Sequence, residues 1–261
     1  MRNRFSTALV TLTLISSVFA AVGVSAEPTE EAKKSFNAAV EAVKTGNAAA
    51  AVTAYEEAVK ASPDYLQAHI NVGAIYYEQG KLAEATTHLE AAVKLDSTSA
   101  DAYRNLGLVH TQAGKFDEAT AAFTRLNAFD PKSAASGWSA LGAAKKKKGD
   151  TVGAKAAYEM AIKADPGDAK TLYNLGNMQK DANQFDEAIA TYKKAIAANP
   201  KYIEAYYNLA ISSHQLDMEN CVTDYEAFLK AAQGSSKWKS KVAEVQGIVK
   251  QIKDYLAAKG E

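Results

Sequence analysis

Small, large and polar residues recur in a fixed order along this chain, about every 34 residues from Ala32 onward. The clearest copy runs from Ala169 to Pro200, with apolar helical segments on either side of a polar turn at residues 182–184. This order predicts a helix, a short turn, a second helix and a stop. We take this pair of helices as the unit from which the chain is built.

Each landmark of the unit has a packing reason. Gly176 and Ala188 have almost no side chain, so two helices that carry them can cross with their backbones close together. Tyr192, four residues after Ala188, fills the space beside that crossing. Pro200 has no N–H with which to continue a helix, so the second helix ends there.

The unit occurs six times, and the copies begin near residues 32, 66, 100, 135, 169 and 203. Repeat position 8 is always glycine or alanine, and position 20 is alanine in the first five copies. Position 24 is large in each of these five: Tyr55, Leu89, Phe123, Tyr158 and Tyr192. Four of the five prolines occupy position 32. A period between about 20 and 50 residues is typical of a solenoid.

The fourth copy carries the fullest set of landmarks: Trp138, Leu141, Gly142, Ala154, Tyr158 and Pro166. Their spacing resembles the tetratricopeptide repeat signature, in which W-x2-L-G is followed by A-x3-F and then by proline. The resemblance to this family covers roughly residues 32 to 232. It implies an all-α, right-handed solenoid of six helix-turn-helix units over residues 27–236, and the binding of a protein or peptide.

A last amphipathic segment, residues 237–261, follows the turn at 234–236. Its apolar residues form one stripe at steps of three or four: Trp238, Val242, Val245, Val249, Ile252 and Leu256. We predict that this segment is a C-terminal capping helix, which covers the open end of the solenoid.

The N-terminal segment has a different composition. Arg2 and Arg4 precede an uncharged run that ends in small residues at positions 24–26, which predicts a signal peptide over residues 1–26. The alternative is an uncleaved membrane anchor, because the run is long enough to reach across a bilayer. Its many Thr and Ser residues make it a poor anchor. We therefore expect an exported protein, periplasmic or fully secreted, with no membrane span in the mature chain.

Charge and composition exclude several classes of function. The chain has 30 Lys+Arg and 30 Asp+Glu, so removal of Arg2 and Arg4 leaves a net charge near −2 and no electrostatic basis for binding nucleic acid. The four histidines are too scattered for a metal site, and the sequence has no nucleophile motif or dinucleotide loop. We therefore expect no metal, no cofactor and no enzyme activity. Cys221 is interpreted as a small buried residue rather than a reactive thiol.

Repeat position 6 is the strongest candidate for a binding function. Asparagine is a weak helix former, yet it occupies this position in five of six copies: Asn37, Asn71, Asn105, Asn174 and Asn208, with Ala140 in the fourth. An amide can bond both the C=O and the N–H of an extended peptide. In the tetratricopeptide family this position faces the concave groove, and the row resembles an asparagine ladder that holds a peptide backbone. The alternative is a structural role, in which the amides bond across the layer of first helices.

Other groove positions add polar and aromatic groups in the fifth and sixth copies, namely Lys170, Tyr173, Asn177 and Tyr207. Tyr173 and Tyr207 have the same repeat position, a spacing suited to holding a ligand side chain between two rings. The carboxylate clamp of the family uses Lys at position 5 and Asn at position 9. Asn177 matches this pattern but Tyr173 stands at position 5, so the clamp is incomplete.

Four lysines end the first helix of the fourth copy, at residues 145–148. Such a run is usually a solvated helix end, favourable near the negative end of the helix dipole. The alternative is that Lys146 and Lys147 supply charge to the groove where Ala140 interrupts the asparagines.

Together these features favour an exported scaffold or adaptor that binds an extended peptide or protein segment in its concave groove, in cell-envelope assembly, secretion or complex formation. A self-assembling structural element is the alternative, and an enzyme is a more distant one. Concentration-dependent mass in light scattering distinguishes self-assembly from a monomer with a protein partner.

The first testable prediction concerns processing. If residues 1–26 are a cleaved signal peptide, protein purified from its native host begins at Glu27. N-terminal sequencing checks this, and recovery of intact Met1 in the membrane fraction would contradict it.

Overall fold

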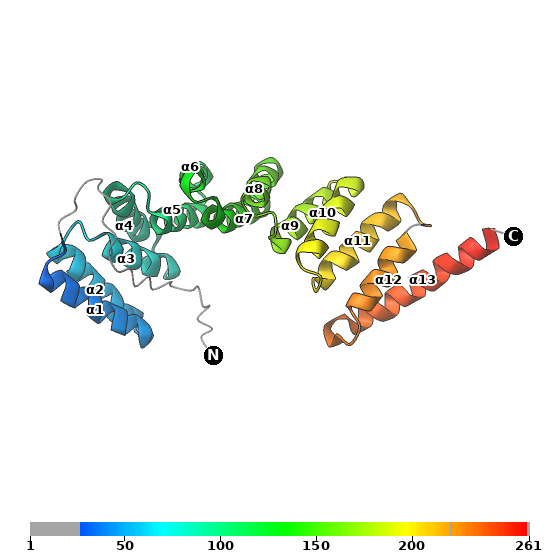
Figure 1. Ribbon diagram of the computed structural model, residues 1–261, viewed down its shortest axis with the longest axis horizontal. Coiled ribbons are helices and arrows are strands. Elements are labelled where there is room, and N and C mark those ends of the chain that lie inside the picture. Colours follow the sequence, from blue (N-terminus) through cyan, green and yellow to red (C-terminus); the bar gives the residue numbers. More distant parts are fainter. Residues whose placement is uncertain (1–26, 220, 260–261) are drawn as a thin grey trace.

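In a computed structural model, residues 27–219 and 221–259 are described, and they fold into successive pairs of helices joined by short turns (Figure 1). The predicted signal segment lies outside the described residues. The elements are α1 (Glu30–Lys44), α2 (Ala48–Ala61), α3 (Leu66–Glu78), α4 (Leu82–Leu95), α5 (Ala100–Ala113), α6 (Phe116–Phe129), α7 (Pro131–Lys147), α8 (Thr151–Ala164), α9 (Ala169–Asp181), α10 (Phe185–Ala198), α11 (Ile203–Leu216), α12 (Cys221–Ala231), the 3-10 helix η1 (Ser236–Trp238) and α13 (Lys239–Lys259).

A residue in the left-handed conformation stands at the turn inside each of the first five pairs. Four of these are glycines with φ between 73° and 86°: Gly46, Gly80, Gly114 and Gly149. The fifth is Asn183, with φ of 60°. Glycine adopts this conformation without a steric cost and asparagine tolerates it better than most residues, so each turn reverses the chain within a few residues.

The core lies between the helices, where a large side chain of a second helix fits against a glycine of a first helix. Phe123 of α6 lies between Gly107 of α5 and Gly137 of α7, and a Cβ atom added at either glycine would overlap its ring. At Gly176 an added Cβ would lie 2.7 Å from a ring carbon of Tyr192. The packing predicted from the alternation of small and large positions is confirmed.

The first helices of the pairs form the inner layer of the solenoid. α3 contacts α5, α5 contacts α7 and α9 contacts α11, whereas no two successive second helices make comparable contacts in the described part of the chain. The layer whose helices touch follows the shorter path and therefore lines the concave side. Figure 1 shows the pairs following one another along the long axis, which confirms the predicted all-α solenoid.

The fourth pair departs from its neighbours at its start. α7 begins at Pro131, four residues before the boundary predicted at Ala135. The Asp130 side chain accepts a hydrogen bond from the N–H of Ser133 and caps the helix. Proline fits the first helical position because its missing N–H would be unpaired there in any residue. Pro131 therefore ends α6, as predicted, and also begins α7.

The C-terminal end is built from α12, η1 and α13. Val245, Val249 and Ile252 of α13 are buried in one apolar cluster with residues of α12, so the predicted stripe faces that helix. Trp238 lies in η1, before α13 rather than within it. Cys221 is fully buried in the same cluster, and burial raises the pKa of its thiol. Its interpretation as a small buried residue is confirmed.

The glycine packing predicts opposite effects for one substitution at two sites. Gly137→Ala in α7 should lower the unfolding free energy by about 1–3 kcal/mol, because the new Cβ enters the Phe123 ring and overpacks the core. Gly247→Ala in α13 meets nothing within 4 Å, so helix propensity should raise stability by about 0.5–1 kcal/mol. Urea denaturation measures both. Stabilisation by both alanines would contradict the packing described here.

Candidate functional site

The asparagines predicted to contact a ligand are distributed along the inner layer. Asn37, Asn71, Asn105, Asn174 and Asn208 belong to α1, α3, α5, α9 and α11, and Ala140 of α7 interrupts the series. Each stands at the same position of a first helix, directly before the residues that pack against a second helix. We refer to these five residues as the asparagine row.

Three members of the row have amides without a partner. Asn105 and Asn174 are half-buried and Asn37 is exposed. None of these three side chains makes a hydrogen bond within residues 27–219 and 221–259. Each amide therefore still offers a carbonyl acceptor and an NH2 donor on the inner layer.

Asn71 and Asn208 are instead bonded within the protein. Asn71 donates to the Tyr55 hydroxyl at 3.1 Å. Asn208 donates to Asn177 Oδ1 at 2.9 Å and to the Tyr173 hydroxyl at 3.0 Å, so it links α11 to α9. Only Asn208 bonds across the layer of first helices, because Tyr55, the partner of Asn71, belongs to the second helix α2. The row divides into free and engaged amides.

Asn177 is also occupied by its neighbours. Besides Asn208, the Tyr192 hydroxyl donates to Asn177 Oδ1 at 2.7 Å. Burial raises the pKa of Tyr192, so its phenol stays protonated and remains a donor. The sequence singled out Asn177 for its place in the clamp pattern but missed Tyr192 and Tyr55 as hydrogen-bond partners. Both are tyrosines at position 24, where a phenylalanine or leucine would pack equally well.

Tyr173 and Tyr207 each lie among rings of the protein itself. Tyr173 is 4.9 Å from the Tyr202 ring, measured between centroids. The Tyr207 ring is 5.3 Å from Phe228 and 5.7 Å from Trp238, and so belongs to the C-terminal cluster. Each ring therefore packs against two rings of the protein, since Tyr173 also lies 6.0 Å from the Tyr192 ring.

The lysines of the run at residues 145–148 differ in burial and in their ion pairs. Lys145 is largely buried and lies 3.6 Å from Asp150, whereas Lys146 forms an ion pair at 3.2 Å with Asp181 of α9. Lys147 is exposed and, like Lys170, makes no ion pair within the described part of the chain. An exposed ion pair contributes about 0–1 kcal/mol, so the Lys146 contact is readily exchanged for another carboxylate.

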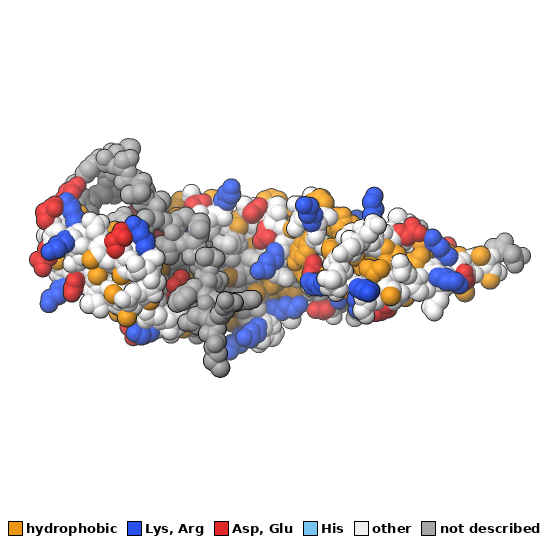
Figure 2. Space-filling view, turned by 90° about the horizontal axis from the view of Figure 1, so that it is seen from below, with side chains coloured by type: hydrophobic (Ala, Val, Ile, Leu, Met, Phe, Trp, Pro, Cys, Tyr) orange, Lys and Arg blue, Asp and Glu red, His pale blue; other side chains and the backbone are white. Residues whose placement is uncertain are grey.

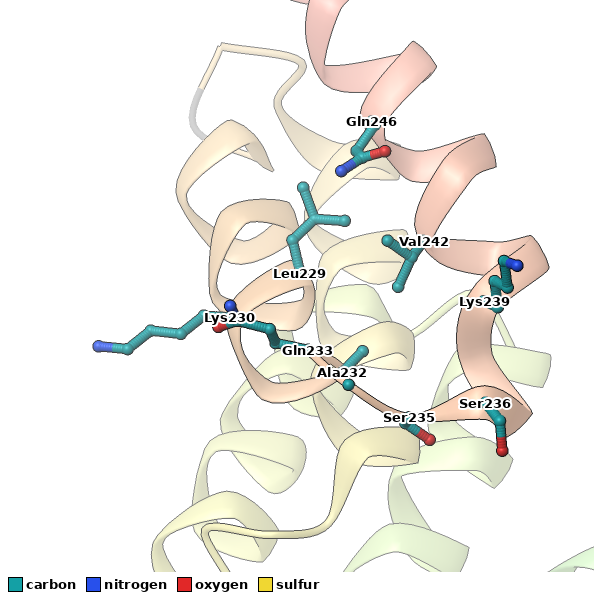
Figure 3. Close-up of a pocket in the computed structure, with 10 residues that line it drawn as sticks. Leu229, Lys230, Ala232, Gln233, Ser235, Ser236, Lys239, Val242 and Gln246 are labelled. Carbon is teal, nitrogen blue, oxygen red and sulfur yellow. The ribbon is translucent and has the colours of Figure 1, made fainter.

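A groove of about 590 Å³ lies between α12 and α13 near the C-terminal end (Figure 3). Leu229 and Val242 approach each other across it, and Lys230 points away from it (Figure 3). No buried polar atom without a partner lines this groove in the described residues. It therefore offers a partly apolar surface without a group that would fix the orientation of a ligand.

Two histidines and a carboxylate form a chain of polar contacts. His69 Nε2 lies 3.0 Å from the Pro63 carbonyl, and its Nδ1 lies 3.2 Å from Nδ1 of His88. A carbonyl only accepts, so His69 carries its proton on Nε2 and accepts from His88. His88 Nε2 in turn lies 3.1 Å from Glu56. No group of three or more potential metal ligands occurs among the described residues.

The visible surface carries both signs of charge. Figure 2 shows basic and acidic side chains interspersed along one face, with apolar side chains gathered over the region of α9 to α12. Among the described helices, none combines the length and the apolar character required to cross a bilayer.

Comparison with known proteins identifies the family. Residues 14–246 match the family model described as the C-terminal domain of cilia and flagella-associated protein 70, a tetratricopeptide repeat domain. The chain belongs to this tetratricopeptide repeat family.

A stretch of this tetratricopeptide chain is also similar to a curated protein. Over 56 residues it is 39% identical to the peroxisomal targeting signal receptor of Kluyveromyces lactis. These 56 residues are 22% of this chain and 10% of the receptor. The chain therefore matches only about a tenth of the length of this relative.

Solved structures share the fold over longer stretches. MamA is similar over 62% of this chain and 95% of its own, with 28% identity and a TM-score of 0.55. YrrB, a tetratricopeptide protein described as having an unusual peptide-binding site, is similar over 68% of this chain and 91% of its own, with 20% identity and a TM-score of 0.53. The second likeness shows the fold alone. This tetratricopeptide chain is a protein-interaction scaffold.

A buried histidine predicts a dependence of stability on pH. His110 of α5 is buried, its Nδ1 has no hydrogen-bond partner, and burial lowers its pKa. His110 therefore binds a proton at a higher pH in the unfolded chain than in the folded chain. The stability contributed by neutral His110 is present above a pH of about 6.5 and is lost as the pH falls through the folded-state pKa.

The comparison with His110→Gln isolates this contribution, because glutamine does not titrate. The stability advantage of the native chain over the variant should shrink between pH 7.5 and pH 5.5, by at most about 1.4 kcal/mol per pH unit. Urea melts at both pH values measure it. An advantage that stays constant or grows on acidification would contradict the assignment.

Proposed function

We propose that this protein is an exported scaffold that binds an extended peptide or protein segment along its inner layer. The observation that carries the proposal is the pair of free amides, Asn105 and Asn174, which are half-buried on first helices and make no side-chain hydrogen bond to any residue that the structure describes. A half-buried amide that bonds nothing within the protein is suited to bonding a ligand. Both amides would form hydrogen bonds with the backbone of the bound segment, so the side chains of that segment would have little effect on affinity.

Charge supplements the amides where the row is interrupted. Ala140 offers no hydrogen bond, and Lys146 and Lys147 follow it on the same helix. Lys147 is free, and Lys146 can exchange Asp181 for a carboxylate of the ligand. The proposed segment is therefore extended and acidic near the fourth repeat.

The names of two similar proteins agree with a peptide ligand. YrrB is described as having a peptide-binding site, and the receptor of Kluyveromyces lactis recognises a targeting signal. The proposed location outside the cytoplasm, in the periplasm or as a secreted protein, rests on the pattern of residues 1–26. A role in envelope assembly, secretion or complex formation is consistent with that location.

Self-association is a second candidate, favoured by exposed apolar side chains near the C-terminal end. Leu216, Met218 and Tyr255 are about half exposed, at 47%, 45% and 54%. Such groups suit end-to-end contacts between copies. A mass that rises with concentration in light scattering supports this function, and a constant monomer mass rejects it.

The double variant Asn105→Ala with Asn174→Ala tests the main proposal. Neither side chain is bonded within the protein, so helicity and melting temperature should stay nearly unchanged. Partner affinity should fall by roughly 5- to 150-fold, since each lost hydrogen bond is worth about 0.5–1.5 kcal/mol. Circular dichroism and isothermal titration measure the two effects.

Asn208→Ala serves as the matched control. It removes the hydrogen bonds to Asn177 and Tyr173, so it should lower stability by about 1–3 kcal/mol. A double variant that melts earlier but binds its partner normally would overturn the proposed role of the free amides.

A further inference from the structure

The fourth repeat lacks a large side chain at a position where its neighbours have one. The first residue of α4, α6 and α10 is Leu82, Phe116 and Phe185, respectively, whereas α8 begins with Thr151. Leu82 packs against the cluster that contains Leu106 of the following first helix. Phe116 likewise packs against the cluster that contains Leu141 of the following first helix. α8 has no such side chain at its junction with α9, although Leu175 of α9 is itself buried.

The absent side chain leaves a groove between the fourth and fifth repeats. Its volume is about 460 Å³, and its lining includes Leu175 and Met178 of α9, which face the place of the absent side chain. Val152, the next residue of α8, is an apolar rim residue that is 81% exposed. We refer to this space as the junction groove. Its size suits one or two side chains of a ligand rather than a globular surface.

A polar group of the junction groove has no partner. Gln179 of α9 is only 9% exposed, and its Oε1 is buried without a hydrogen bond in the described part of the chain. A buried amide oxygen without a donor destabilises the protein unless a ligand or water supplies one. Gln179 lines the groove, so a side-chain rotation that turned this oxygen toward the groove would let a backbone N–H of a bound segment donate to it.

The rim of the junction groove is basic. Lys146 and Lys155 line it, and the exposed Lys147 and Lys148 follow Lys146 in the chain. Lys155, Lys147 and Lys148 make no ion pair within the described residues. The one acidic lining residue, Asp181, is already paired with Lys146 at 3.2 Å. The net field at the rim therefore favours an anionic ligand.

We infer that the junction groove is a second docking site, which binds an acidic segment of a protein partner through one apolar side chain. The apolar side chain covers Leu175 and Met178 in place of the absent leucine or phenylalanine. A backbone N–H of the segment donates to Gln179, and flanking carboxylates pair with Lys155 and Lys146. The site lies beside the asparagine row and shares Lys146 with the path proposed above, but its apolar lining residues, Val152, Leu175 and Met178, do not belong to that row.

The experiment uses the full chain and a fluorescein-labelled peptide with one leucine between three glutamates on each side. Thr151→Phe and Thr151→Leu fill the groove with the residues found at this position in neighbouring repeats, so both variants should fold and melt no earlier than the native chain. Each should weaken peptide binding at least about tenfold in fluorescence anisotropy. Thr53→Phe on α2 is the matched control and should bind normally.

Two charge-reversal variants test the basic rim of the groove in the same assay. Lys155→Glu should weaken binding several-fold at low salt and less at high salt, whereas Lys163→Glu, on the same helix outside the groove, should have little effect. A peptide with serine in place of leucine should bind at least about tenfold more weakly to the native chain.

Several results would overturn the inference. Binding to Thr151→Phe equal to that of the native chain, with a normal melting temperature, would show that the peptide lies elsewhere. Loss of binding in the Asn105→Ala, Asn174→Ala variant alone would place the peptide on the asparagine row, which supports the proposed function and rejects the second site. A native dimer that Thr151→Phe dissociates would make a second copy the occupant instead.

Discussion

The close approach of first and second helices at glycine is the constraint on which the rest of this structure depends. Phe123 fits between two glycine backbones, and no side chain larger than hydrogen has room at Gly107 or Gly137. This contact fixes the distance between α6 and both neighbouring first helices. Because each pair contacts mainly the next pair, the same local contact, repeated with Tyr158 and Tyr192, sets the course of the whole solenoid.

That regular course gives the inner layer its functional geometry. Successive first helices present the same face at one-repeat intervals, so a single residue type repeated at one position becomes a row of equivalent groups. The structure divides this row by the chemistry of the neighbouring residues. Asn208 donates hydrogen bonds to Tyr173 and Asn177, whereas no residue in the described part of the chain bonds the amides of Asn105 and Asn174.

Much of the fold could be predicted from the sequence because small and large residues alternate at fixed spacing and the contacts between them are local. The start of α7 at Pro131 could not, because proline suits both the end of one helix and the first turn of the next. The division of the asparagine row also required the structure. Whether an amide is free depends on the side chain that happens to reach it, as Tyr55 reaches Asn71, and repeat spacing does not specify this.

The junction groove has a cause that is visible in the sequence and a consequence that is not. Its cause is visible in the sequence as Thr151 at a position that holds Leu82, Phe116 and Phe185 elsewhere, but one polar residue in a repeat is usually only a solvated position. The consequence, a groove lined by Met178 and by Gln179, whose Oε1 has no partner in the described residues, follows only from the packing of α8 on α9. Departures from a repeat pattern are thus as informative about function as the pattern itself.

The central claim is that the inner layer of the solenoid holds the partner. Site-specific photo-crosslinking in the native host tests it most directly, with the photoreactive residue placed at Ala140 on α7 or at exposed Lys193 on the second helix α10. The account predicts one discrete protein adduct from position 140, reduced by the alanine substitutions of Asn105 and Asn174, and no such adduct from position 193. The same adduct from position 193, with none from position 140, would contradict it.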